Sequence, residues 1–197
     1  MDGHIIFNIG RQFGSGGKSV ALAVGEKLGI KVYDNELILK AASESGLSEE
    51  LFRRSDEQKR ILGLGFQPGG LNDREIFRIQ SAVISRIAEE SSAVFVGRAS
   101  DYVLRGRTDC VDVFVCAPDV CRRERVSRRM GISCEEAEKL MNKKDKGRED
   151  YYNFFTFGHW GVASNYDLCV DSSILGTDAT ADFIIDFAVR SGKLGKR

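Results

Sequence analysis

The chain has 197 residues, of which 42% are hydrophobic and 29% are charged. This length is sufficient for one α/β domain that buries a proper core. The formal net charge is zero, so no general attraction to nucleic acid or to a membrane surface is expected. No apolar run approaches the roughly 18 residues of a membrane span, and the N-terminus does not have the pattern of a signal peptide. We expect a cytoplasmic protein without a nucleic-acid or membrane partner.

Histidine and cysteine are sparse and do not follow a metal-binding pattern. None of the cysteines forms a C-x-x-C pair, and their number is odd, which argues against a zinc site or a disulfide framework. The cysteines are Cys110, Cys116, Cys121, Cys134 and Cys169. We expect them to be reduced and mostly buried. The two histidines, His4 and His159, are expected to be structural.

Apolar, β-rich runs alternate with helical patterns along the chain. The predicted strands are residues 4–9, 30–34, 93–97, 110–117 and 166–171. Such continuous apolar runs are typical of parallel strands that are covered on both faces, with helices as the crossovers. The pattern therefore predicts an α/β fold: a five-stranded parallel sheet with helices on both faces.

Several of the predicted helices have recognisable ends. They span residues 19–29, 73–91, 118–131 and 178–190, and one more begins at the capping box Ser133-x-x-Glu136. Residues 35–75 also look helical, apart from a loop at 63–71. No internal repeat is evident.

A glycine-rich segment, IGRQFGSGGKSV at residues 9–20, lies between the first strand and the first helix. It resembles the phosphate-binding pattern G-x-x-x-x-G-K-[ST], with Gln12 in place of the first glycine. The backbone N–H groups of such a loop point at phosphate oxygens, Lys18 would reach the terminal phosphates, and Ser19 would offer its hydroxyl to Mg²⁺. The candidate phosphate-binding residues are Gly14, Ser15, Gly16, Gly17, Lys18 and Ser19. The alternative is a glycine-rich turn with an exposed lysine.

Other candidate residues follow neighbouring strands. Because the carboxyl ends of parallel strands share one edge of the sheet, this loop, Asp34 and Arg98 should lie along the same edge. Asp34 could orient an acceptor or hold Mg²⁺ through water, and Asp101 and Arg105 could join the pocket of Arg98. Asp112 falls near the start of its strand, at the opposite edge, so no clear Walker-B carboxylate is found.

Basic residues cluster at 122–129 and at 139–148. In a chain without net charge, this clustering creates a local positive field. The two segments would form either a mobile cover over a polyphosphate or two solvated helix faces, and the residues leave both readings open.

Six segments taken together resemble the cytidylate-kinase-like family of P-loop kinases. They are RQFGSGGK, VYDNELI, VGRASDYVL, GISCEEAEKL, KKDKGREDYYNFFT and NYDLCVDSSILG. The resemblance implies a single P-loop kinase domain over residues 1–197, with an acceptor-binding segment at about 35–92 and a helical lid at about 119–160. It also implies ATP, Mg²⁺ and a small nucleotide substrate.

The same resemblance implies roles for individual residues. Gly14 to Ser19 would bind the ATP phosphates, and residues 173–178 would lie near the adenine. Tyr33 and Asp34, with Arg98, would bind the acceptor. The expected lid residues that close on phosphates are Arg122, Arg125, Lys144 and Arg148. The far end of the lid would dock through the aromatic residues Tyr151, Tyr152, Phe154, Phe155, Phe157 and Trp160.

The resulting expectation is an ATP-dependent kinase that phosphorylates CMP, dCMP or a related small acceptor. Lys18, Arg98, Arg125 and Arg148 would be its catalytic residues. Two alternatives stay open: a kinase for another small metabolite, and a nucleotide-binding regulatory module. Gln12 and the helical character of residues 35–75 are the departures from the family pattern that keep them open. The oligomeric state is not determined by the sequence.

Overall fold

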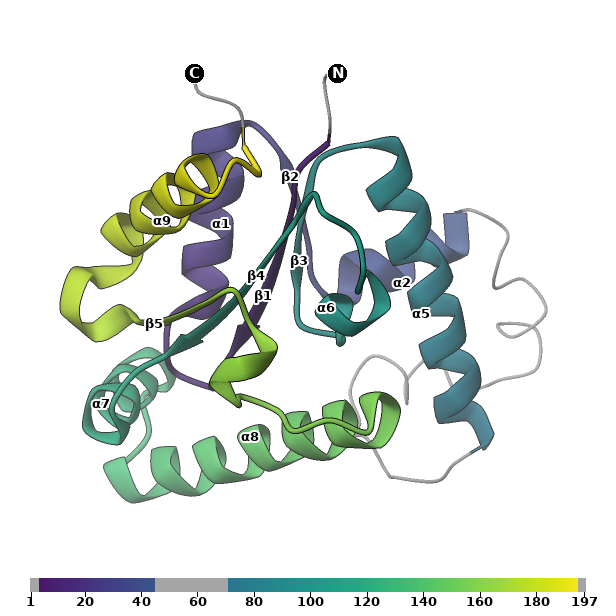
Figure 1. Ribbon diagram of the computed structural model, residues 1–197. Helices are drawn as coiled ribbons and strands as arrows, with labels where there is room; N and C mark the ends of the chain where they lie inside the picture. Colours follow the sequence, from purple (N-terminus) through teal and green to yellow (C-terminus); the bar gives the residue numbers. More distant parts are fainter. Residues whose placement is uncertain (1–3, 45–70, 195–197) are drawn as a thin grey trace.

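The computed structural model describes residues 4–44 and 71–194, and its centre is a parallel sheet (Figure 1). The sheet has five strands in the order β2-β3-β1-β4-β5. Their bounds are Ile6–Arg11 for β1, Lys31–Tyr33 for β2, Ala93–Val96 for β3, Cys110–Cys116 for β4 and Leu168–Asp171 for β5. The predicted five-stranded parallel sheet is therefore confirmed, with ends that differ from the prediction by up to two residues.

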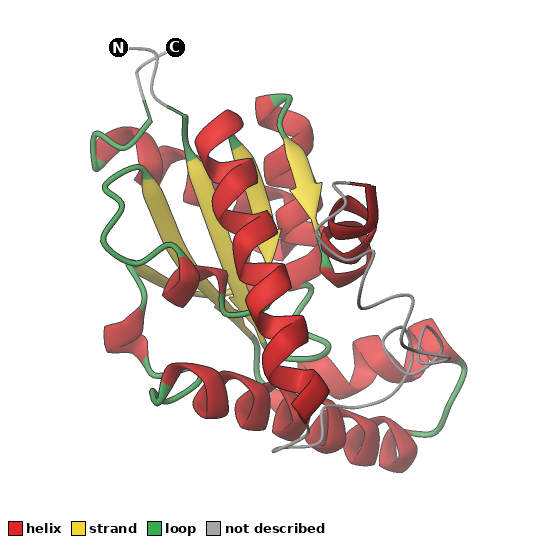
Figure 2. Ribbon diagram, turned by 90° about the vertical axis from the view of Figure 1, so that its right-hand side faces the viewer, coloured by secondary structure: helices red, strands yellow, loops and turns green. Residues whose placement is uncertain are grey.

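Helices cover both faces of the sheet, as predicted (Figures 1 and 2). On one face lie α1 (Gly17–Leu28) and α9 (Ser172–Arg190); on the other lie α2 (Asn35–Glu44), α5 (Leu71–Glu90) and the short α6 (Ser100–Val103). Two more helices, α7 (Asp119–Met130) and α8 (Cys134–Thr156), lie at the carboxyl ends of the strands, opposite the chain termini. A short 3₁₀ turn spans Ala163–Asn165.

Strand β1 contributes apolar side chains to both faces of the sheet, so helices must cover both faces. Because successive side chains point to opposite faces, Phe7 and Ile9 join the core under α1 and α9, whereas Ile6 joins the core under α2, α5 and α6. All three side chains are fully buried. Asn8 shares the face of Ile6 and is the polar exception on this strand.

The predicted helix ends are confirmed at α7 and α8. Gly131, at φ 67°, ends α7, and Ser133 forms a capping box with Glu136 at the start of α8. Helix α9 begins earlier than predicted, at Ser172, because a kink at Gly176 (φ 76°, ψ 174°) joins a first short turn to the main helix. No helix within the described part of the chain is long and apolar enough to cross a membrane.

The aromatic end of α8 packs on the rest of the protein, with one exception. Phe155 stacks on Phe77 of α5 with ring centroids 4.2 Å apart, and Trp160 meets Phe114 of β4 edge-on at 5.3 Å. Tyr152 is buried. The docking predicted for Phe157 is wrong: it caps the end of α8 in a left-handed conformation, and 90% of its surface is exposed.

The exposure of the cysteines and the end of one predicted loop differ from the predictions. The cysteines are not mostly buried, because only Cys110 is buried, whereas Cys134 and Cys169 are exposed. The described cysteines are all free thiols, as expected. The loop predicted at 63–71 falls outside the described residues except for Leu71, where α5 already begins. The middle of the acceptor-binding segment predicted at 35–92 lies outside them as well.

Candidate active site

The glycine-rich loop connects β1 to α1 at the carboxyl edge of the sheet, and its glycines are required by its shape. Gly14 (φ 82°) and Gly16 (φ 81°) have left-handed backbones. A Cβ on Gly14 would lie 2.8 Å from the Val126 side chain, and one on Gly17 would lie 2.5 Å from Cβ of Arg11. The loop thus approaches β1 and α7 more closely than any larger residue permits.

Gln12 fits the position of the missing first glycine without strain. It is not among the described residues with positive φ, so a side chain there costs nothing in backbone conformation. Its Oε1 accepts a hydrogen bond from the backbone N–H of Ala117 at 3.2 Å, which ties the loop to the end of β4. The departure from the family pattern is therefore compatible with a formed loop.

Ser15 holds the middle of the loop in place. It is fully buried, and its hydroxyl donates to the Gln12 carbonyl at 2.9 Å. The hydroxyl of Ser172, at the start of α9, donates to the Ser15 carbonyl. These contacts fix the loop between β1 and α9, and they leave Lys18 and Ser19 exposed on the first turn of α1.

Lys18 and Asp34 meet at the edge of the sheet, as the topology predicted. Lys18 Nζ lies 2.7 Å from Asp34 Oδ2, and 63% of the lysine side chain remains exposed. The other carboxylate oxygen accepts from the N–H groups of Glu36 and Leu37 at 3.2 Å, at the start of α2. Burial alone would raise the pKa of Asp34, but the hydrogen bonds from Lys18 and this backbone hold it below its ordinary value. Asp34 is therefore an anion at neutral pH.

Arg98 follows β3 in a strained segment. Gly97, Arg98 and Ala99 all have positive φ, of 74°, 62° and 51°. Non-glycine residues in this region cost about 1–3 kcal/mol each, and such strain is concentrated at functional sites. The Arg98 guanidinium lies over the ring of Tyr151, 4.8 Å from its centroid.

A series of hydrogen bonds holds Tyr151 in position. Its hydroxyl donates to Gln80 Oε1 at 3.1 Å, and Gln80 Nε2 donates to Asn35 Oδ1 at 3.0 Å. Gln80 is only 1% exposed. These hydrogen bonds link α8, α5 and α2, so the Tyr151 ring forms a fixed platform for the Arg98 guanidinium.

Arg11, at the end of β1, lies at this site, although the sequence analysis did not predict it as a site residue. A Cβ on Gly97 would lie 1.9 Å from Arg11 Nη1, so the side chain passes directly over that glycine. Burial, with the charges of Arg148 and Arg98, lowers the pKa of Arg11 to about 9. Three arginines therefore converge beside the loop. An arginine as the last residue of a buried strand, directly before a phosphate loop, was the signal for it.

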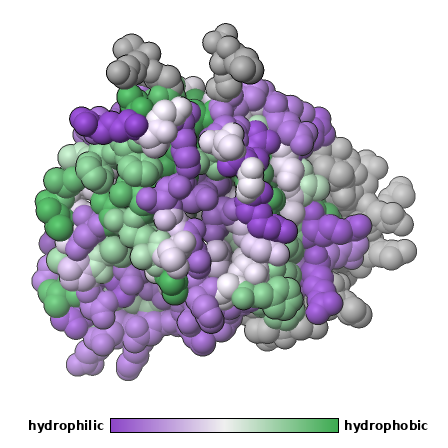
Figure 3. Space-filling view, in the orientation of Figure 1, coloured by the Kyte–Doolittle hydropathy of each residue, from purple (hydrophilic) through white to green (hydrophobic). Residues whose placement is uncertain are grey.

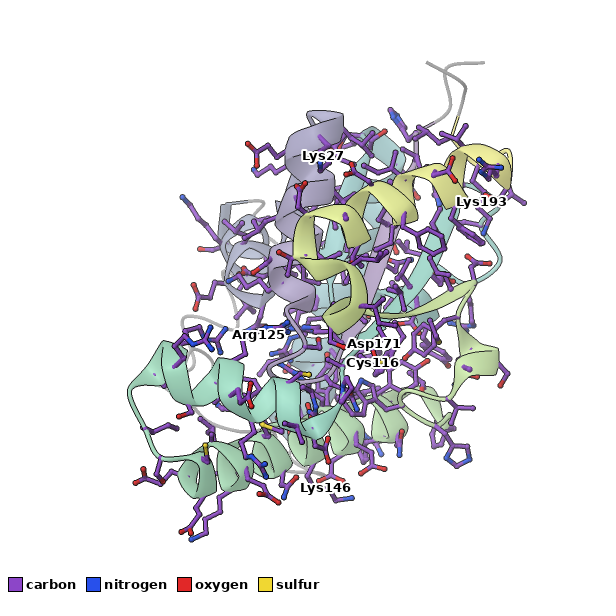
Figure 4. All side chains as sticks on the ribbon, turned by 90° about the vertical axis from the view of Figure 1, so that its left-hand side faces the viewer. Lys27, Cys116, Arg125, Lys146, Asp171 and Lys193 are labelled. Atoms are coloured by element: carbon purple, nitrogen blue, oxygen red, sulfur yellow. The ribbon has the colours of Figure 1, made fainter. Side chains whose placement is uncertain are left out.

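The arginines of α7 and α8 contact the backbone of the loop. Arg125 donates to the Gly14 carbonyl at 2.8 Å, and Arg148 donates to the Arg11 carbonyl at 3.1 Å. Figure 4 shows Arg125 between α7 and the loop that precedes α1. Arg122 is only 5% exposed and is occupied by Phe13, Asp119 and Asp145, so in this conformation its guanidinium holds the loop and the helices together. Lys144 is exposed on α8.

Asp101 and Tyr33 both have partners within the protein. Tyr152 donates its hydroxyl to Asp101 Oδ2 at 2.7 Å, and burial raises the pKa of Asp101. Asp101 also interacts with Asp112 of β4, which is held by Asn8 Nδ2 at 2.7 Å. Tyr33 packs on Phe95, with ring centroids 5.7 Å apart. Asp112 lies toward the start of β4, away from the loop, as predicted.

The surface around the site differs from the surface over α9. The lower edge of the molecule in Figure 3, over α7 and α8, is mostly hydrophilic, whereas hydrophobic residues are exposed on the side of α9. The exposed hydrophobic residues of α9 are Ile174, Leu175 and Phe183. A charged ligand is therefore better matched to the edge where the loop meets α7 and α8.

Comparison with known proteins identifies relatives that match most of the chain. A protein from Methanopyrus kandleri named cytidylate kinase is 29% identical over 89% of this chain and 89% of its own length. Another protein of that name, from Ignicoccus hospitalis, is 30% identical over 74% of this chain and 86% of its own length.

Solved structures share the fold. An uncharacterised protein from Eubacterium ventriosum is 28% identical, with a TM-score of 0.74 over 93% of this chain and 98% of that one. A shikimate kinase from Acinetobacter baumannii, 12% identical over 96% of this chain and 94% of its own, has a TM-score of 0.53, which concerns the fold alone. The fold is that of the P-loop kinases, and these relatives support a nucleotide kinase. The model of the cytidylate kinase-like family matches residues 6–174. The chain belongs to this family.

Proposed function

We propose that this protein transfers a phosphoryl group from ATP to a small phosphorylated acceptor, with CMP or dCMP as the first candidates. The observation that carries the proposal is the convergence of three arginines beside a formed phosphate loop: the Arg11 guanidinium passes over Gly97, next to Arg98, and Arg148 donates to the Arg11 carbonyl. Family membership and the name of the relatives from Methanopyrus kandleri and Ignicoccus hospitalis support the choice of acceptor.

The donor would bind at the start of α1. The glycine backbone from Gly14 to Gly17 suits close approach by phosphate oxygens, and the helix N-terminus favours negative charge. Lys18 would leave Asp34 and pair with the terminal phosphates, and Arg125 lies next to Gly16 to join it. Residues 173–178, on the first turn of α9, would lie near the adenine.

The residues present fit a magnesium ion. Mg²⁺ takes oxygen ligands, usually few from the protein and the others from phosphate and water. The Ser19 hydroxyl and the ionised Asp34 carboxylate are such ligands at the edge of the sheet. Within the described residues no cluster of three or more acidic, cysteine or histidine side chains offers a fuller site. When bound there, Mg²⁺ would neutralise charge on the transferring group.

The acceptor phosphate would lie opposite the donor, on Arg98. A planar guanidinium can bind a phosphate with two parallel hydrogen bonds, and the platform of Tyr151 and Gln80 fixes its direction. Asp34, Tyr33 and Asp101 would contact the sugar or base. Phosphoryl transfer depends mainly on positioning and charge neutralisation, so closely spaced arginines and one lysine suffice without a strong protein base.

The test is an assay of ADP release with ATP, Mg²⁺ and a panel of acceptors. The panel contains CMP, dCMP, UMP, AMP, shikimate and several sugar alcohols. We expect turnover with CMP or dCMP. Arg98→Ala should lower kcat/KM by about 10²-fold, roughly 2.7 kcal/mol of transition-state stabilisation. Arg98→Lys should recover only part of this, because a point charge does not replace the fork.

Arg86→Ala is the matched control, since Arg86 is exposed near the end of α5, before the start of β3, and pairs with Glu90. It should leave kcat/KM unchanged. Turnover only with a non-nucleotide would keep the kinase and reject the cytidylate acceptor. Tight ATP binding without turnover on any acceptor would reject the enzyme and favour a nucleotide-binding regulatory module.

A further inference from the structure

The phosphate loop is held by side chains of α7 and α8 as well as by its own sheet. Phe13 donates its backbone N–H to Asp145 Oδ1 at 2.6 Å, and its carbonyl accepts from Arg122 at 3.0 Å. Arg125 and Arg148 bind the carbonyls on either side, those of Gly14 and Arg11. Side chains from α7 and α8 thus bind backbone groups of three loop residues.

Asp145 is the centre of this arrangement. One carboxylate oxygen lies 2.5 Å from Arg122 Nη1, and the other lies 3.2 Å from Arg148 Nη1 and 2.6 Å from the Phe13 nitrogen. Only 16% of the Asp145 side chain is exposed. One carboxylate therefore pairs with two arginines and binds the loop backbone, which a surface ion pair does not do.

The Phe13 side chain belongs to the same unit. It packs on a small core formed by Val126, Ala137 and Met141, which is separate from the two cores that flank the sheet. Arg129 and Arg148 lie over its ring, at 5.6 Å and 5.4 Å. Both the backbone and the side chain of Phe13 are thus attached to α7 and α8, so a movement of these helices would be transmitted to the loop.

We propose that Asp145 is a positioning residue that fixes the phosphate loop to the arginine-bearing helices α7 and α8. It places the loop amides and the guanidinium groups of Arg125 and Arg148 in one fixed arrangement around the donor phosphates. The functional part of this inference rests on the proposed kinase activity; the attachment of the loop does not.

The first test uses the nucleotide-free protein and does not depend on activity. Hydrogen exchange of the Phe13 N–H should be at least about 10-fold faster in Asp145→Ala than in the wild type, because its acceptor is removed. Asp145→Asn keeps an acceptor oxygen but loses the charge, so it should be intermediate. Asp150→Asn is the matched control, since Asp150 lies on the same helix and pairs only with Lys146 among the ion pairs of the described residues. It should exchange like the wild type.

The second test separates positioning from simple loss of structure. Asp145→Asn should raise the KM for ATP about 10-fold and lower kcat, with little change in the KM for the acceptor, whereas Asp150→Asn should change neither. Equal exchange of Phe13 in Asp145→Ala and wild type would overturn the proposal, as would equal kinetic losses in the two asparagine variants. If Asp145→Ala does not fold, Asp145→Asn decides both tests. If the wild type has no turnover, the kinase proposal fails and exchange alone decides the attachment.

Discussion

Lys18 pairs with Asp34 in the structure, and we propose that it pairs with the ATP phosphates when the donor is bound. In the structure its ammonium is bound to Asp34 at 2.7 Å while most of the side chain is exposed. An ion pair this exposed contributes at most about 1 kcal/mol, so phosphate oxygens can replace the carboxylate at little cost. Asp34 would then be released toward the acceptor or the metal.

We expect Lys18→Ala to weaken ATP binding by about 1.5–3 kcal/mol, the value of a hydrogen bond to a charged group. Isothermal titration calorimetry with Mg²⁺ and ATP measures this directly. Lys193→Ala is the control, because Lys193 follows α9 far from the loop and pairs with Asp167 (Figure 4). Unchanged ATP affinity in Lys18→Ala would place the phosphates elsewhere.

Arg98 has a strained backbone at the position where we propose that the acceptor phosphate binds. Its φ of 62° would suit glycine better, yet an arginine occupies the position. The strain is accepted because it directs the guanidinium onto Tyr151 and toward the loop. A glycine at this position would relax the backbone and lose the guanidinium that we propose binds the acceptor phosphate.

At the scale of elements, α7 and the first half of α8 are built as a unit. They share their own small core, and the capping box at Ser133 and Gly131 fixes the turn between them. The second half of α8 packs on α5 through Phe77 and Phe155. The predicted lid, about 119–160, therefore has a docked end and an end that meets the loop.

We expect this lid to move together with the loop attached to it and to close when ATP and acceptor are both bound, which would exclude water from the transferring group. Hydrogen exchange over residues 119–150 should slow on addition of both ligands and change less with ATP alone. Exchange at α5, where the docked end packs, serves as the internal control. A pattern over 119–150 that ignores both ligands would contradict the lid.

At the scale of the molecule, the sheet contains a partly buried carboxyl group, that of Asp112, that makes stability depend on pH. The pKa of Asp112 is raised to about 6, chiefly by burial. The negative charges of Asp101 and Asp167 also raise this pKa, whereas the hydrogen bond from Asn8 and the positive charge of Lys193 lower it. Asn8 Oδ1 is buried without a hydrogen-bond partner among the described residues, so a protonated Asp112 would supply one.

Because the folded pKa lies above the ordinary value of 3.8, the folded protein binds this proton more tightly than the unfolded chain. Its contribution is complete below about pH 4 and is lost as the pH rises through about 6. The free energy of unfolding of Asp112→Asn, minus that of the wild type at the same pH, should therefore be about 1–3 kcal/mol larger at pH 7.5 than at pH 4.5. Urea denaturation at both values measures it, with Asp150→Asn as the control. The same difference at both pH values would show that Asp112 does not take up the proton.

The sequence by itself determined the elements and the edge at which the site forms. Apolar runs identify five strands, and parallel strands with helical crossovers bring the loop, Asp34 and Arg98 to one edge whatever the details of packing. The ends of α7 and α8 were also readable, because Gly131 and the Ser133 capping box act through local backbone geometry. Segments with local causes are predictable from local sequence.

Only the tertiary structure decided which charged side chains are free and which are occupied. A count of arginines in α7 does not distinguish Arg122, buried against Asp145, from Arg125, which reaches the loop. Arg11 became part of the site only because Gly97 leaves room for it, and Phe157 became exposed because α8 ends there. These outcomes depend on contacts between residues far apart in the chain, whose burial and charge compensation no local pattern records.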